Sequence, residues 1–288
     1  MIDYHLHLWP HSRRDTPVSI EVISRYVHEA SEKGVVEIAL TEHLFRFRQA
    51  DAVLRGFWKS DSNVQLAREM ESYWNRHALA DLDQYVEAVQ EAKAAGLPVI
   101  LGLEVDYYPD QMDIVADLLK GYPFDVLLGS VHWLGAWGFD DIDSDLVMAE
   151  WEIRDIEGVW DHYTASLEEL AQTKVCDVLA HPDLVKICGR FPRVPEEFYD
   201  RMAEAAKSTQ MSAELSSAGW RKPIGEQYPA RYLLKKFVDA KVGLTTASDA
   251  HRQDDVASNM TRLRELLDDV GCHELTGYHD RKAHSIKL

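Results

Sequence analysis

Histidine, glutamate and aspartate recur in this chain directly after short apolar runs. The first example is His5-Leu6-His7, Glu104 ends a later run, and Asp249 and His251 follow a third. Residues two apart on a strand project from the same face, so His5 with His7 and Asp249 with His251 form two pairs of donors. Neutral imidazole and carboxylate groups bind divalent transition metals, and a carboxylate can bridge two of them. The pattern therefore indicates metal chemistry.

Nine donors of this kind lie at or just beyond the ends of six predicted strands, namely His5, His7, His11, His43, Glu104, His132, His181, Asp249 and His251. Any one of the 13 histidines alone is more often a satisfied core or surface residue than a ligand, but nine donors at one end of consecutive strands are hard to assign to chance. No cysteine joins the set, which disfavours a structural zinc site and favours an open hydrolytic cluster. We predict a multinuclear metal site and assign no role to His28, His77, His162, His273, His279 and His284.

The elements that must position these donors alternate regularly along the chain. Apolar, β-branched runs predict seven strands, over residues 1–6, 35–40, 98–103, 125–129, 177–179, 211–215 and 242–246. Helical periodicity predicts helices over residues 19–33, 81–95, 110–120, 159–173, 195–208, 229–240 and 254–270. This βα alternation favours a parallel sheet covered on both faces, either a barrel or an open sheet. In a barrel, the donors would meet at the C-terminal face, where such enzymes build their active sites.

Two polar segments rich in Trp, Phe and Asp interrupt the alternation, at residues 44–80 and 133–158. Neither shows a composition change abrupt enough to mark a second domain. We therefore expect one domain over residues 1–288, in which both segments form long loops, with scope for local helix, over the C-terminal face of the barrel.

The composition limits the class of partner. The 288 residues include 31 Lys and Arg against 49 Asp and Glu, a formal charge of −18, which argues against a grip on the phosphate backbone of nucleic acid. No apolar run approaches the roughly 20 residues of a membrane span, and the N-terminus lacks the features of a signal peptide. Cys176, Cys188 and Cys272 form no paired motif and indicate reduced thiols in a cytoplasmic protein. We expect a small-molecule partner, and neither a nucleic-acid polymer nor a membrane.

Several short motifs, in this order, resemble those of the PHP (polymerase and histidinol phosphatase) family: HLH at 5–7, TEH at 41–43, GLE at 102–104, SVH at 130–132, HPD at 181–183 and SDAH at 248–251. The stretches 179–186, 213–223 and 225–229 resemble its histidinol-phosphatase branch in particular. The resemblance implies an α/β fold, a distorted (β/α)7 barrel similar to a TIM barrel. It also implies two to three divalent metals, for which zinc, manganese and iron all accept such ligands.

Carried over by motif, the resemblance implies how the donors divide among the metals. His5, His7, Glu104 and Asp249 would hold the first, and Glu104 would bridge to a second completed by His132 and His181. His11, His43 and His251 would hold the third.

The implied activity is a metal-dependent phosphomonoesterase that hydrolyses L-histidinol phosphate to L-histidinol and phosphate through a metal-activated hydroxide. Asp249, Glu104 and His251 would be the catalytic residues. A phosphate dianion also requires fixed cations. The candidates, in order of preference, are Arg221, Lys222, Arg190 and Arg46.

Three alternatives to this activity stay open. One is a phosphoesterase of the same family acting on nucleotides or other small esters, and another is a non-catalytic metal-binding module. The third, an amidohydrolase, normally requires a strand-borne lysine or carboxylated ligand that the sequence does not place. Around the site, Trp133, Trp137, Phe139 and Trp220 could wall a planar substrate or pack on the barrel rim, and Asp140, Asp141 and Asp143 could meet an ammonium group or form a solvated turn.

Overall fold

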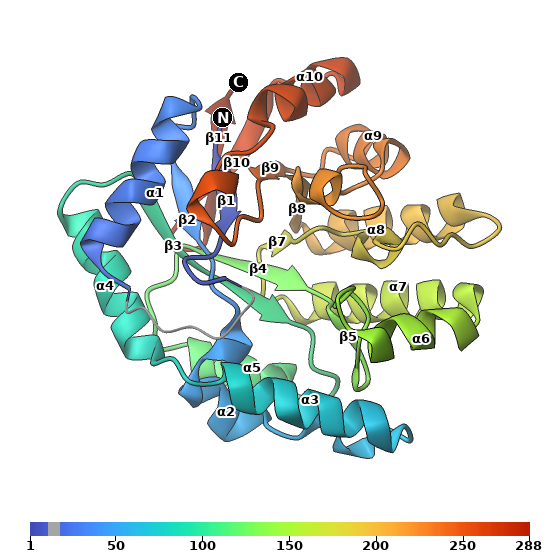
Figure 1. Ribbon diagram of the computed structural model, residues 1–288. Helices are drawn as coiled ribbons and strands as arrows, with labels where there is room; N and C mark the ends of the chain where they lie inside the picture. Colours follow the sequence, from blue (N-terminus) through green and yellow to red (C-terminus); the bar gives the residue numbers. More distant parts are fainter. Residues whose placement is uncertain (11–17) are drawn as a thin grey trace.

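Seven parallel strands form the centre of the molecule in this computed structural model, which describes residues 1–10 and 18–288 (Figure 1). They are β1 (Asp3–Leu6), β2 (Ile38–Leu40), β3 (Val99–Asp106), β4 (Val126–Ser130), β7 (Val178–Leu179), β8 (Ser212–Ser216) and β9 (Leu244–Ala247). Their spatial order is also their chain order. All seven predicted strands are therefore confirmed. His11, one of the predicted metal ligands, lies outside the described residues.

The ring of strands is nearly closed, because the ends of β1 and β9 meet. The backbone N–H of His7 donates to the carbonyl of Ala250 at 2.8 Å, and that of Asp249 donates to the carbonyl of His5 at 2.9 Å. The structure is thus a distorted barrel and not an open sheet. The hydrogen bonds that join its two ends run between segments carrying predicted metal ligands.

Helices surround the strands and confirm the predicted alternation (Figure 1). They are α1 (Ile20–Glu32), α4 (Leu82–Ala94), α5 (Met112–Leu119), α7 (Ile156–Thr173), α8 (Pro195–Thr209), α9 (Arg231–Asp239) and α10 (Met260–Val270). Side-chain caps begin α1, α4 and α7; ahead of α4, for example, the Asp81 carboxylate accepts the N–H groups of Asp83 and Gln84. The start of α10 was predicted six residues too early, because Ala257 and Asn259 have positive φ angles that helix does not allow. No helix in the described ranges is long and apolar enough to cross a membrane.

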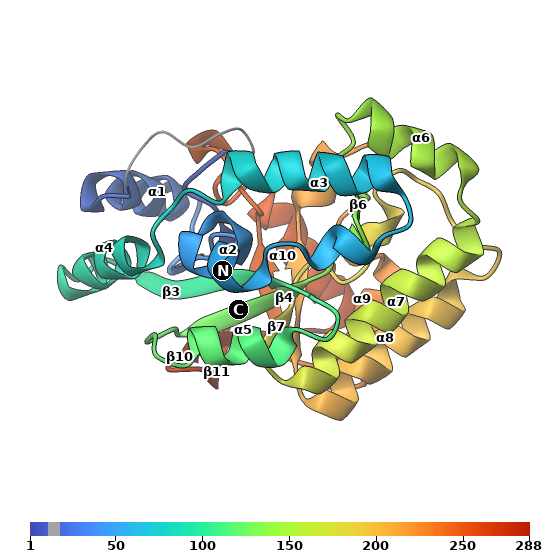
Figure 2. The same ribbon diagram turned by 90° about the horizontal axis from the view of Figure 1, so that it is seen from below.

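The two interrupting segments are more regular than loops. Residues 44–80 contain α2 (Arg48–Leu54) and α3 (Val64–His77), and residues 133–158 contain the hairpin β5 (Trp133–Leu134)–β6 (Trp137–Gly138) and α6 (Asp145–Ile153). The segments pack on each other, since the backbone N–H of Ala136 donates to Asp61 at 2.8 Å and the Asn63 amide donates to Glu150 at 2.8 Å. Their aromatic residues explain why both segments are structured, because packed rings supply the apolar burial that a polar loop lacks. Figure 2 shows α3 and α6 on one side of the strands.

A C-terminal hairpin that the sequence did not predict covers the opposite, N-terminal end of the barrel (Figure 2). It consists of β10 (Glu274–His279) and β11 (Lys282–Lys287). The Tyr278 hydroxyl lies 2.8 Å from the Ser212 hydroxyl at the start of β8, and the Arg281 backbone N–H donates to the Asp125 carbonyl beside β4 at 2.9 Å. The turn residues Asp280 and Arg281 both have positive φ, as this hairpin type requires. Because neither is Gly or Asn, the usual turn signal is missing from the sequence.

The hairpin stabilises the barrel through buried apolar contact, which a Leu275→Ala variant tests. Leu275 is 1% exposed, so we expect a loss of about 2–4 kcal/mol in the free energy of unfolding. Urea denaturation would measure it, with Lys282→Ala on the exposed part of β11 as the matched control. Equal free energies of unfolding for the two variants would show that the hairpin does not stabilise the barrel.

Candidate metal centre

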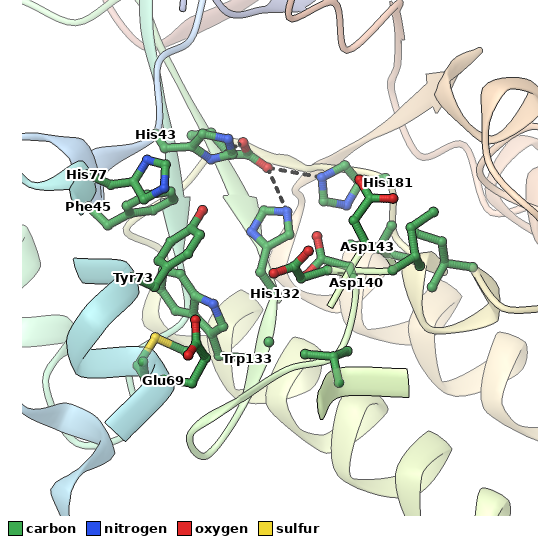
Figure 3. Close-up of a pocket in the computed structure, with 18 of the residues that line it drawn as sticks. His43, Phe45, Glu69, Tyr73, His77, His132, Trp133, Asp140, Asp143 and His181 are labelled. Atoms are coloured by element: carbon green, nitrogen blue, oxygen red, sulfur yellow. Dashed lines mark hydrogen bonds and ion pairs between the residues drawn. The ribbon is translucent and has the colours of Figure 1, made fainter. Parts of the chain in front are cut away.

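The Glu104 carboxylate lies at the centre of the donor cluster, at the C-terminal half of β3, and is fully buried. Its Oε2 atom lies 3.2 Å from Nε2 of His5 and 3.5 Å from Nε2 of His7. Its Oε1 atom lies 3.0 Å from Nε2 of His181 and 3.4 Å from Nε2 of His132, as the dashed lines in Figure 3 mark. Nδ1 of His43 is closer still to Oε2, at 2.7 Å. The two oxygens therefore face two different sets of imidazoles, three at Oε2 and two at Oε1. This is the arrangement of a carboxylate that can bridge two cations.

Asp249 and two further histidines complete the cluster from the adjoining strand ends. The Asp249 Oδ1 atom lies 3.6 Å from Nε2 of His7 and 3.9 Å from Nε2 of His5. The His7 ring stacks on those of His43 and His251 at centroid distances of 4.3 and 4.1 Å, and these two rings lie 5.6 Å from each other. Four overlapping triads have donor atoms within 4.8 Å of one another: His7–His43–His251, His5–Glu104–His181, His5–His7–Asp249 and His43–Asp106–His132.

Several of these donor atoms are buried without a hydrogen bond. They include Nε2 of His5, both ring nitrogens of His7, Nδ1 of His43 and Oε2 of Glu104. A buried polar atom without a partner costs about 1–3 kcal/mol, and several converging on one space cost more than a fold normally tolerates. Divalent cations at that space would satisfy them, so the donor set fits metal binding.

The charges of the cluster favour the same conclusion. Burial acts to raise the pKa of Glu104, but the imidazoles of His5 and His43 outweigh it and hold that pKa well below its usual range. Burial likewise acts to lower the pKa of His5, yet Glu214, Glu104 and Asp249 together raise it well above the ordinary value. The Glu104 carboxylate thus remains ionised and draws positive charge into the interior, which metal cations can supply.

A second layer of carboxylates orients the histidine rings. Glu214 on β8 lies 2.8 Å from Nδ1 of His5, and Asp106 lies 2.6 Å from Nδ1 of His132. Each holds the far side of a ring and so turns Nε2 toward Glu104. Neither residue was among the predicted site residues. Asp106 follows Glu104 by two residues, which is the same-face spacing that identified the other donor pairs, whereas nothing in the sequence marks Glu214.

The backbone at two candidate ligands is itself unusual, since His181 has φ of 26° and Asp249 has φ of 51°. Left-handed conformations of non-glycine residues cost about 1–3 kcal/mol and persist where the surroundings enforce them. At Asp249 the enforcing group is Arg221, whose guanidinium donates to the carbonyls of Ser248 at 2.6 Å and Asp249 at 3.1 Å. The Asp3 carboxylate accepts both the N–H and the hydroxyl of Ser248 at 2.7 Å. These contacts hold Asp249 facing the cluster.

A cavity of about 310 Å³ opens from the cluster toward α3 and the β5–β6 hairpin (Figure 3). Trp133 and the acidic residues Asp140, Asp141 and Asp143 line it. His77, to which the sequence analysis assigned no role, also lines it. The remaining predicted aromatic residues do not: Trp137 and Phe139 pack against Trp151, and Trp220 lies under Arg262.

The four predicted phosphate-binding cations differ in placement. Lys222 lines the cavity, whereas Arg221 braces the Asp249 loop. Arg190 pairs with Glu152 away from the cavity. Arg46 is buried, and its Nη2 donates to the Pro10 carbonyl at 2.9 Å. The structure thus brings one of the four to the cavity wall.

Seven βα units around a buried histidine–carboxylate cluster define a metal-binding (β/α)7 barrel. Within that class, this chain belongs to the PHP domain family, whose model matches residues 3–218.

Two known proteins are similar to this chain over most of its length. A Deinococcus radiodurans protein named "Probable histidinol-phosphatase" is 33% identical over 233 residues, which cover 80% of this chain and 87% of that protein. The crystal structure of histidinol phosphate phosphatase from Lactococcus lactis, complexed with zinc, L-histidinol and phosphate, superposes with a TM-score of 0.73. It is 19% identical and covers 98% of both chains, so it supports the fold over nearly the whole length.

The orienting role of Glu214 predicts a specific loss in a Glu214→Gln variant. Without the Glu214 carboxylate beside Nδ1 of His5, we expect metal affinity to fall roughly 10- to 100-fold with little change in fold. Calorimetric titration with zinc would measure it, and Glu204→Gln, an exposed position on α8, is the control. Wild-type affinity in Glu214→Gln would mean that His5 is oriented by other contacts.

Proposed function

We propose that this barrel holds two or three divalent transition metals in the cluster around Glu104. The carboxylate arrangement carries the proposal, because each oxygen faces its own set of imidazoles. His5, His7 and Asp249 would serve one side, His132 and His181 the other, and His43 and His251 a third position beside His7. Zinc, manganese and iron all accept nitrogen and oxygen donors, and zinc accompanies the Lactococcus protein.

On this basis the chain is a metal-dependent phosphatase that hydrolyses L-histidinol phosphate to L-histidinol and phosphate. The name of the Deinococcus relative and the ligands of the Lactococcus protein support this substrate. The cavity volume suits a small molecule. When bound, the metals would acidify water at neutral pH and neutralise charge on the phosphoryl oxygens.

Residues of the chain itself would contact the metals, bind the phosphate and position the metal ligands. Asp249 and His251 border both the cluster and the cavity, so they can contact the metals and the ester at once. Lys222 lies in the cavity wall, where its ammonium can bind a phosphate oxygen. Arg221 fixes the position of Asp249 through the backbone. Burial of the cluster excludes bulk water, which strengthens each of these electrostatic contacts.

The net charge and the cysteines support a proposal for the partner of this protein and for its cellular compartment. We propose a small phosphate ester as the partner and no nucleic-acid polymer, given the charge of −18. We place the protein in the cytoplasm, because Cys176, Cys188 and Cys272 are all free thiols.

A phosphate-release assay with metal and chelator arms tests the activity directly. We expect L-histidinol phosphate to be hydrolysed far faster than a nucleoside monophosphate, a nucleoside 3′,5′-bisphosphate or 4-nitrophenyl phosphate. Chelation should abolish release, and added zinc or manganese should restore it, because the proposed reaction depends on the bound metals. The chelated protein should also unfold at a lower temperature, since bound metal stabilises only the folded state.

If the protein prefers a nucleotide in the same assay, the proposed metal centre stands and the proposed substrate is wrong. Metal binding without hydrolysis of any ester would instead favour the non-catalytic metal-binding module.

Lys222→Ala and Arg221→Ala should distinguish a residue that binds the phosphate from one that positions a metal ligand. Loss of the Lys222 ammonium should raise KM about tenfold or more, the worth of one charged hydrogen bond, and leave metal content unchanged. Loss of Arg221 should lower metal content and kcat, because Asp249 would lose its brace. Steady-state kinetics with metal analysis would measure both, with exposed Lys235→Ala as the control. A rise in KM at full metal content in Arg221→Ala would restore its predicted role in phosphate binding.

A further inference from the structure

The Glu42 carboxylate lies beside the metal cluster and is fully buried. Its Oε1 atom accepts the backbone N–H groups of Leu8 at 2.6 Å and Trp9 at 3.0 Å. Its Oε2 atom has no hydrogen bond with any described residue and lies 3.7 Å from Nδ1 of His7. One oxygen thus fixes the carboxylate against the segment that follows β1, and the other is available to the imidazole.

Arg46 supplies the positive charge that a buried carboxylate requires. It is 2% exposed, and its Nη1 atom lies 3.9 Å from Oε2 of Glu42. Its Nη2 atom donates to the Pro10 carbonyl at 2.9 Å, whereas Nε and Nη1 have no hydrogen bond in the part of the chain that the structure describes. Arg46 is not among the residues that line the cavity. It therefore offers its charge to Glu42 and not to a substrate in the cavity.

The His7 ring needs an acceptor on the side that Glu42 occupies. Its Nε2 atom faces the cluster, 3.5 Å from Oε2 of Glu104 and 3.6 Å from Oδ1 of Asp249. An imidazole that binds a metal through Nε2 carries its proton on Nδ1, so an acceptor at Nδ1 sets both the tautomer and the ring orientation. The separation of 3.7 Å between Nδ1 and the Glu42 carboxylate can be closed by a small rotation of the side chain or bridged by one water.

We infer that Glu42 and Arg46 form a positioning pair for His7, in which Glu42 accepts the Nδ1 proton of the imidazole in a hydrogen bond and Arg46 balances the charge of the carboxylate. The inference rests on the proposed function, in which Nε2 of His7 binds a divalent metal. It gives Arg46 a role through Glu42 in place of the predicted role in phosphate binding. Because His7 faces Oε2 of Glu104, the pair should affect metal bound on that side and leave metal on the Oε1 side in place.

A Glu42→Gln variant separates positioning of the ring from attachment to the backbone. The amide oxygen can still accept the N–H groups of Leu8 and Trp9, whereas the amide nitrogen cannot accept a hydrogen bond from Nδ1 of His7. In zinc buffers of defined free concentration, we expect this variant to need roughly 10- to 100-fold more zinc than the wild type to fill the affected position. Metal content measured by plasma mass spectrometry should therefore fall but not to zero, because the Oε1 side of Glu104 keeps its ligands.

Two further variants complete the experiment. If Glu42→Gln does not fold, because Arg46 is then buried without an anion, the double variant Glu42→Gln/Arg46→Met removes that charge and should show the same loss of zinc affinity. Glu91→Gln, an exposed position on α4, is the control and should bind zinc as the wild type does.

Wild-type zinc affinity in Glu42→Gln or in the double variant would overturn the inference and leave the proposed metal centre intact. Loss of all bound metal, together with a lower unfolding temperature of the chelated double variant, would also overturn it, because Glu42 would then stabilise the fold and not one ligand. A wild-type protein that binds no zinc would contradict the proposed function itself, and the inference with it.

Discussion

The structure depends on one buried carboxylate. Glu104 is fully enclosed at the end of a central strand, and its Oε2 atom has no hydrogen bond. An ionised carboxylate in such surroundings is stable only if positive charge compensates it on more than one side. Five imidazoles face its two oxygens, three at Oε2 and two at Oε1. The requirement for compensating charge links the metal centre, the histidine orientations and the closure of the barrel.

The fold meets this requirement with contacts that serve two purposes. The backbone hydrogen bonds between His5 or His7 and the Asp249–Ala250 segment close the ring of strands and also set the distances within the donor cluster. Asp3 and Arg221 hold Ser248 and Asp249 in place, so the unfavourable backbone at Asp249 is sustained by neighbouring polar contacts. At the N-terminal end of the barrel, the C-terminal hairpin contributes apolar packing through Leu275 and hydrogen bonds through Tyr278 and Arg281.

Much of this was predictable from the sequence, for a physical reason. His5, His43, Glu104 and His181 each follow an apolar run, and parallel strands in a barrel must end at one face, so order along the chain translates into proximity. The partners of the rings were not predictable, because whether Glu214 meets Nδ1 of His5 depends on side-chain rotation across two strands separated by 209 positions. Likewise, a sequence cannot show that the Arg221 guanidinium turns to the backbone while Lys222, its neighbour, lines the cavity.

The most direct test of the account is a crystal structure of the metal-loaded protein with anomalous diffraction measured at the absorption edge of the bound metal. We predict at least two anomalous peaks flanking Glu104, with Oε1 contacting the ion shared with His132 and His181 and Oε2 contacting the ion shared with His5 and His7. A single peak, or peaks that do not contact Glu104, would contradict the bridging role on which the account is built.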